Sequence, residues 1–174
     1  MRKAMNSIAS TGHERRHDAA VEDARTTAAT LVFAWGNPGR GDDALGPLLV
    51  EALEALGLPG VECLTDYQLQ VEHALDLRGR RRVLFVDASV DVAAPCRLSP
   101  LAPARDASFS THAMSPAAVL QVYVDVEGET PPPAWLLAIR GECWALGAPP
   151  SPAAMKHLEE ALALARRWID ACAA

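Results

Sequence analysis

Three residues in this chain have side chains that can hold a divalent metal ion or transfer protons. Asp43 closes a glycine-rich loop after the apolar run 31–35, Asp87 ends the apolar run 83–86, and His112 lies in a loop before a helix start. Two carboxylates and an imidazole suit a metal ion of borderline softness, such as nickel or zinc with open positions. The same set suits acid–base chemistry, so the residue types alone leave both open.

The loop 36–43 has the sequence Gly-Asn-Pro-Gly-Arg-Gly-Asp-Asp and precedes a predicted helix, where α/β proteins often bind phosphate. Its residues oppose that function. Pro38 stands where a dinucleotide loop has its second glycine, and Asp42 and Asp43 replace the Lys and Ser or Thr of a P-loop. Two carboxylates repel phosphate, so the loop favours a cation or a positively charged partner. Alternatively, one of the two acids only caps the helix and complements its dipole.

Asp87 follows four apolar residues, where an unpaired carboxylate is costly to bury. If the strands at 31–35 and 83–87 are parallel, they end at the same edge of the sheet, and Asp43 lies near Asp87. Alternatively, Asp87 only hydrogen-bonds the loop 88–89. The remaining features are interpreted more simply: His73 and His157 as surface residues, and the arginine-rich segment 78–82 as a solvated turn.

Apolar periodicity predicts the elements that position these residues. Short apolar runs predict strands at 31–35, 61–64, 83–87 and 135–139, with an edge strand near 97–101. Helical spacing and Ser-Pro pairs predict helices at 45–56 and 67–75, and from Ser115 and Ser151 onward. The alternation predicts an α/β three-layer sandwich, with a twisted, mostly parallel sheet of about five strands and helices on both faces.

The predicted domain organisation is a flexible N-terminal tail at 1–30 and one α/β domain at 31–174. The 174 residues, 50% hydrophobic and 22% charged, are typical of one soluble globular domain. A net charge of −6 opposes a nucleic-acid partner. No apolar run approaches the roughly 18 residues of a membrane span, and no signal-peptide pattern follows Arg2 and Lys3, so a cytoplasmic protein is expected.

Other catalytic motifs are missing from the sequence. The four cysteines, Cys63, Cys96, Cys143 and Cys172, form no C-x-x-C motif, which disfavours a zinc ribbon or a redox site and predicts buried thiols. There is no G-x-S-x-G or H-E-x-x-H motif either. Covalent catalysis and a self-sufficient zinc protease are therefore disfavoured.

Taken together, these residues resemble the maturation endopeptidases of nickel–iron hydrogenases, which trim the C-terminal extension of the large-subunit precursor. The resemblance is carried by the loop 36–46, the strand end Val86-Asp87-Ala88 and the histidine before the next helix, and it spans about 31–169. Three phrases resemble the branch serving cytoplasmic NAD-reducing, bidirectional hydrogenases: Asp-Tyr-Gln-Leu at 66–69, Thr-His-Ala-Met-Ser-Pro at 111–116 and Ile-Arg-Gly-Glu at 139–142.

The resemblance implies that Asp43, Asp87 and His112 bind metal and carry out catalysis. The first of these positions is often glutamate in the family, and Asp43 is one methylene shorter. The metal would be nickel supplied by the substrate, with no permanently bound cofactor, so that cleavage checks nickel insertion. The expected partner is the hydrogenase large-subunit precursor, with no nucleic acid, no membrane and a monomeric protein. Arg40 and the arginines 80–82 are weaker candidates for docking the precursor.

Two functions of other classes stay open at the level of sequence. One is a non-catalytic nickel-binding checkpoint or chaperone that holds the precursor by the same residues. The other is a small-molecule metallohydrolase with its own permanently bound metal. A purely structural role requires Asp43, Asp87 and His112 to face away from one another.

Overall fold

The centre of the molecule is a five-stranded sheet, seen in a computed structural model that describes residues 27–93, 95–106 and 114–171. The strands are β1 (Thr30–Trp35), β2 (Val61–Asp66), β3 (Arg82–Ser89), β4 (Cys96–Leu101) and β5 (Ala134–Arg140). Their order is β2-β1-β3-β5-β4, and only β4, at one side of the sheet, runs antiparallel to its neighbour. The predicted mostly parallel sheet is confirmed, including the edge strand.

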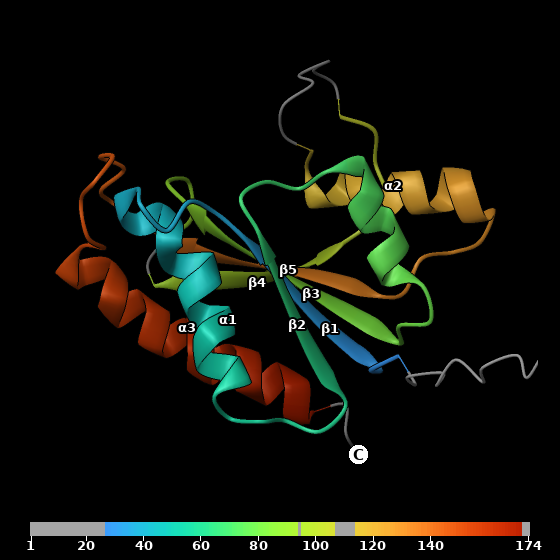
Figure 1. The fold of residues 1–174 in the computed structure, drawn as a ribbon, viewed down its shortest axis with the longest axis horizontal. Helices are drawn as coiled ribbons and strands as arrows, with labels where there is room; N and C mark the ends of the chain where they lie inside the picture. The colour runs from blue at the N-terminus through green and yellow to red at the C-terminus, as the bar shows by residue number, and fades with distance from the viewer. Residues whose placement is uncertain (1–26, 94, 107–113, 172–174) are drawn as a thin grey trace, which may run out of the picture.

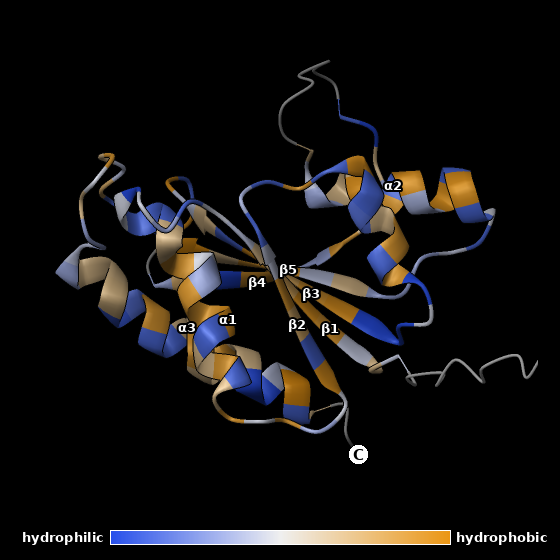
Figure 2. Ribbon diagram, viewed as in Figure 1, coloured by the Kyte–Doolittle hydropathy of each residue, from blue (hydrophilic) through white to orange (hydrophobic). Residues whose placement is uncertain are grey.

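Helices cover both faces of the sheet and complete three layers (Figure 1). They are η1 (Gly41–Ala44), α1 (Leu45–Glu54), η2 (Val71–Leu77), α2 (Pro116–Glu127) and α3 (Pro152–Asp170), with η marking 3₁₀ helices. One core cluster joins the sheet to α1 and α3, and the other joins it to η2 and α2. Figure 2 shows hydrophobic and hydrophilic bands on α1 and α3, as expected for helices that bury one face.

Alternating residues of the central strands enter the two cores. In β1, Val32 and Ala34 face α1 and α3, whereas Leu31 and Phe33 face η2 and α2, and all four are buried. This explains why β1 reads as one continuous apolar run rather than as an alternating pattern. Because β1 and β3 are parallel neighbours, with Phe33 opposite Phe85, their carboxyl ends meet at the same edge, as predicted.

The starts of the two long helices are also confirmed. Ser115 and Ser151 are the N-cap residues of α2 and α3, and each hydroxyl accepts the N–H three positions on, at 3.1 Å and 3.2 Å. A proline follows each serine at the first helical position, where no N–H is needed. Ser-Pro is thus a local signal that tertiary contacts did not override.

The predicted helix at 67–75 is wrong in its start and in the face it buries. Asp66 accepts the N–H of Tyr67, and Gln70 is extended, so helical structure begins only at Val71 and is of the 3₁₀ type. Tyr67 and Val71 are exposed, at 66% and 57%. Ala74 is the buried member of the predicted apolar stripe, and His73, predicted at the surface, is only 8% exposed.

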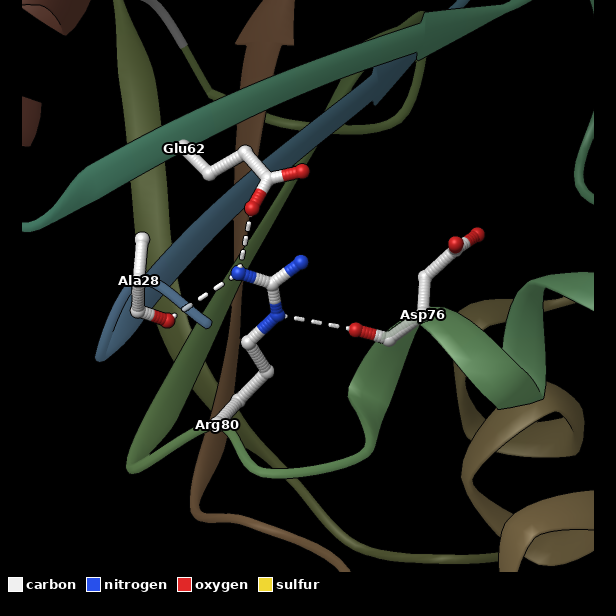
Figure 3. Close-up of polar contacts among 4 residues, drawn as sticks. All are labelled: Ala28, Glu62, Asp76 and Arg80. Atoms are coloured by element: carbon white, nitrogen blue, oxygen red, sulfur yellow. Dashed lines mark hydrogen bonds and ion pairs between the residues drawn. The ribbon is translucent and has the colours of Figure 1, made fainter. Parts of the chain in front are cut away.

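The arginine-rich segment is a turn, as predicted, and Arg78 and Arg81 are exposed, but Arg80 and Arg82 are held inside the protein. The Arg80 side chain is only 6% exposed and donates to Glu62 on β2, to the carbonyl of Ala28 and to the carbonyl of Asp76 (Figure 3). Arg82 donates to the carbonyls of Trp168 and Ile169 at the end of α3. These two guanidinium groups are occupied inside the protein, which removes them as docking groups.

The predicted tail boundary also needs correction. Residues 1–26 lie outside the described residues, but Thr30 already begins β1, and the Ala29 carbonyl accepts the N–H of Arg81 at 2.8 Å. The folded domain therefore includes residues 28–30. Cys63, Cys96 and Cys143 are free and only partly buried, and Cys172 lies outside the described residues. In the described ranges, no helix combines the length and the apolar character needed to cross a membrane.

Candidate functional site

The glycine loop after β1 places Asp43 at the carboxyl edge of the sheet. Gly36 has a φ of 144°, and a Cβ atom at this position would lie 2.0 Å from the backbone oxygen of Asp43. Only glycine allows the chain to pass this close. The N–H of Asn37 donates to Asp43 Oδ2 at 3.0 Å, which fixes the carboxylate beside the end of β1.

Asp87 lies beside Asp43 at the end of β3. Its neighbours Val86 and Ala88 face α1 and α3, so the Asp87 side chain projects to the other face of the sheet, the one covered by η2 and α2. Burial raises the pKa of Asp87 from 3.8 to about 7; the Ala88 N–H lowers it in part, and the charge of Asp43 raises it further. The two carboxylates are therefore close enough to repel each other, in a site that favours a cation.

Asp42 has a different role from Asp43, although the two are adjacent. It is fully buried and accepts four hydrogen bonds, from the N–H groups of Glu142 (2.7 Å), Cys143 (2.8 Å) and Ser151 (2.6 Å) and from the Ser151 hydroxyl (2.9 Å). Burial raises the pKa of Asp42, but these hydrogen bonds outweigh it, and the net shift is downward from 3.8. Asp42 thus ties the glycine loop to the β5–α3 connection instead of capping α1.

His112, the third predicted residue, lies outside the described residues. The residues on either side of its segment are fixed at the site's side of the sheet: Met114 donates its N–H to the carbonyl of Leu69 at 3.2 Å, and Ser115 donates to Asp106. The structure brings Asp43 and Asp87 together, and the described ranges contain no cluster of three or more His, Cys, Asp or Glu side chains arranged for a metal ion. Among the residues that the structure describes, the carboxylates of Asp43 and Asp87 are therefore the groups at this site that could bind a cation.

Asp66 and His73 were not among the predicted site residues, yet they occupy the same edge. Asp66 is the last residue of β2, and its carbonyl accepts the N–H of Gly36 at 3.1 Å. His73 Nε2 lies 3.2 Å from Asp66 Oδ2. Asp66 lies just after the predicted strand 61–64, but no run of four apolar residues precedes it as one precedes Asp87.

Several solved structures that are similar to this chain are named as hydrogenase maturation enzymes. The hydrogenase maturating endopeptidase HybD from E. coli is 25% identical over 78% of this chain and 88% of that chain, with a TM-score of 0.63. An endopeptidase from E. coli, solved in solution, is 27% identical over the same shares, with a TM-score of 0.60. This chain has the fold of the hydrogenase maturation endopeptidases.

A third similar structure, the [NiFe] hydrogenase maturation protease HycI from Thermococcus kodakarensis, is 23% identical over 79% of this chain and 90% of that one, with a TM-score of 0.62. No protein-family model matches the chain, and no curated protein sequence matches it significantly. The predicted resemblance to this family, and with it the peptide-hydrolase class of enzyme, agrees with the structural neighbours. The NAD-reducing branch stays a prediction.

Proposed function

We propose that this protein is an endopeptidase that removes the C-terminal extension of a nickel–iron hydrogenase large-subunit precursor after nickel insertion. The observation that carries the proposal is the pair Asp43 and Asp87, two mutually repelling carboxylates at the carboxyl edge of a sheet. The similarity to endopeptidases named for hydrogenase maturation supports the choice of reaction and of partner. The Asp-Tyr-Gln-Leu phrase at 66–69 favours a precursor of the NAD-reducing type. The proposal includes a monomeric protein that acts in the cytoplasm.

We infer that Asp43, Asp87 and His112 recognise nickel that the precursor already carries. Carboxylate and imidazole ligands bind nickel less tightly than the thiolates of the precursor, which allows release after cleavage. Because the pKa of Asp87 is raised to about 7, protons compete with nickel at this carboxylate near neutral pH. Recognition should therefore strengthen as the pH rises from 6 to 8.

Cleavage itself requires an activated water molecule or a polarised carbonyl. Nickel on the precursor can supply either effect, and an unprotonated carboxylate beside it can accept a proton from the attacking water. The Asn37 N–H holds Asp43 in place by donating to its Oδ2. The chain thus contributes position and a base, while the substrate contributes the metal.

The test mixes the purified protein with nickel-loaded and nickel-free precursor from the same source and measures both products by intact-mass spectrometry. We expect loss of a C-terminal peptide from the nickel-loaded form alone. Asp43→Asn should reduce processing by at least about 1,000-fold, as for removal of a group essential to the transition state, without changing the melting temperature by more than a few degrees. Asp125→Asn, on the exposed surface of α2, is the control and should process normally.

The same experiment separates the alternatives. Stable binding of the nickel-loaded precursor with both masses unchanged identifies a checkpoint or chaperone instead of a protease. A stoichiometric metal in the purified protein, together with hydrolysis of small esters or amides, identifies a metallohydrolase. Normal processing by the Asp43→Asn variant contradicts the assignment of the site.

A further inference from the structure

His73 is an unusual member of the core that joins the sheet to η2 and α2. It is 8% exposed, and its ring packs edge-on against Phe33, with the ring centroids 4.6 Å apart. The N–H of Gln70 donates to its Nδ1 at 2.9 Å, so Nδ1 carries a lone pair and the ring proton is on Nε2. Nε2 lies 3.2 Å from Asp66 Oδ2. Both ring nitrogens therefore have fixed and different partners.

Asp66 contacts both His73 and the glycine loop, and so connects the two. Its Oδ1 accepts the N–H of Tyr67 at 2.5 Å, and Oδ2 faces His73, so the side chain is held at both oxygens. The Asp66 carbonyl accepts the N–H of Gly36 at 3.1 Å. Gly36 packs against the Asp43 backbone so closely that a Cβ at Gly36 would lie 2.0 Å from the Asp43 backbone oxygen. A shift of Asp66 is therefore expected to move the loop that carries Asp43.

The same turn also holds the start of α2. Leu69, midway between Asp66 and His73, is 2% exposed, and its carbonyl accepts the N–H of Met114 at 3.2 Å. Met114 immediately precedes Ser115, the N-cap residue of α2. The turn 66–73 is thus hydrogen-bonded on one side to the glycine loop and on the other to the chain entering α2, two segments far apart in sequence.

We propose that His73 is a positioning residue, which acts through Asp66 and the turn 66–73 to set the spacing between the Asp43 loop and the start of α2. This rests on the function proposed above, because that function needs the Asp43 carboxylate to be held in a fixed position. Reactions that depend on such alignment lose rate steeply with displacements near 1 Å. A histidine is suited to this position because one ring accepts from Gln70 at Nδ1 and brings Nε2 to 3.2 Å from the Asp66 carboxylate.

Two amide substitutions separate the two contacts. In His73→Asn, the amide oxygen replaces Nδ1 as the acceptor for Gln70, but the shorter side chain does not reach Asp66. In His73→Gln, the longer amide reaches Asp66 as a donor, in place of Nε2. His157→Asn is the matched control, because this partly buried histidine on α3 makes one hydrogen bond, to the Arg140 carbonyl.

The first measurement is hydrogen exchange at the Gly36 and Met114 amides, followed by NMR, which needs no substrate. In His73→Asn we expect both amides to exchange about 10-fold faster or more, while those of β3 stay unchanged. We then expect processing of nickel-loaded precursor to fall by about 10-fold to 100-fold in kcat/KM. His73→Gln should restore most of both effects, and His157→Asn should show neither.

Unchanged exchange at Gly36 and Met114 in His73→Asn overturns the proposal, and so does a His73→Gln variant that is as slow as His73→Asn. The second result would mean that the ring matters only as packing against Phe33. If the unmodified protein processes no precursor, the proposed function fails, while the exchange data still decide whether His73 holds the two segments. The two failures are therefore distinguishable.

Discussion

Charged side chains have different surroundings at the two edges of the sheet, the amino edge where the parallel strands begin and the carboxyl edge where they end. At the amino edge, Arg80 precedes β3 and Arg82 begins it, and their hydrogen bonds go to carbonyls, a hydroxyl and the Glu62 carboxylate of this protein. Arg82 also stacks over the Trp168 ring, 4.5 Å from its centroid. At the carboxyl edge, Asp43 and Asp87 repel each other, and the pKa of Asp87 is raised.

This difference indicates which charges serve the fold and which serve function. Arg82 binds the last carbonyls of α3, where a cation complements the helix dipole. Asp42 likewise accepts four hydrogen bonds, so its charge serves the fold, as the arginine charges do, although it is adjacent to Asp43. Asp87 sits where burial disfavours its charged form, an arrangement typical of functional sites and expected to lower stability.

The largest effect on stability is expected from Asp42→Ala. Removing the carboxylate leaves the buried N–H groups of Glu142, Cys143 and Ser151 without their acceptor, which should lower the free energy of unfolding by about 3–5 kcal/mol. Urea unfolding at pH 7 measures this. A loss below 1 kcal/mol would contradict the structural role of Asp42.

The pH dependence of this effect has a definite sign. The folded-state pKa of Asp42 lies below its ordinary value of 3.8, so its carboxylate contributes stability above that value, which is lost as the pH falls through the folded-state pKa. The stability gap between the unmodified protein and Asp42→Ala should therefore be widest above pH 5 and should narrow in acid.

A smaller loss is expected from Arg80→Met at the amino edge. The change removes hydrogen bonds to Glu62, Ala28 and Asp76 but keeps much of the apolar stem, and we expect a loss of about 2–3 kcal/mol with normal processing of precursor. Arg78→Met is the matched control, because Arg78 pairs with Glu127 at the surface and should matter less. Slowed processing by Arg80→Met, at a temperature where the variant stays folded, would contradict the claim that the charges at the amino edge serve only the fold.

The smallest effect, and the only gain, is expected from Asp87→Asn. Because burial raises the folded-state pKa of Asp87 to about 7, its ionisation costs stability as the pH rises from 3.8 through 7. Replacing it by a neutral amide should raise the free energy of unfolding by about 1–2 kcal/mol at pH 8, after discounting for partial exposure, and by almost nothing at pH 4. Processing should be lost.

Urea unfolding of both proteins at pH 4, 6 and 8 checks this prediction. A constant difference across the three values would mean that Asp87 is charged in the folded protein throughout, and that it is not poised near neutrality. A variant that is both more stable and fully active would remove Asp87 from the proposed site.

Much of the fold followed from local patterns. The continuous apolar runs at 31–35 and 83–86 predicted central strands because both faces of such strands are buried. The Ser-Pro pairs at 115–116 and 151–152 predicted helix starts because capping uses atoms within three residues. Asp43 and Asp87 could be named as a pair because parallel strands end at one edge.

Two of the errors arose where a residue's partner lies far away in sequence. The hydrogen-bond partners of Asp42 are 100, 101 and 109 positions distant, so nothing near it distinguished Asp42 from Asp43. Arg80 donates to Ala28, 52 positions away, and the segment looked like a solvated turn. His73 was assigned to a surface because helical periodicity was extended from Tyr67, whereas the turn at Asp66 delays the helix to Val71.

The sequence by itself determined where strands and helices form, which acids close the strands and which family the chain resembles, since each depends on residues within one segment. The tertiary structure alone decided how each charge is used. Burial and hydrogen-bond partners assign Asp42 and Arg80 to the fold and give Asp87 a raised pKa, and they arise only when distant segments meet.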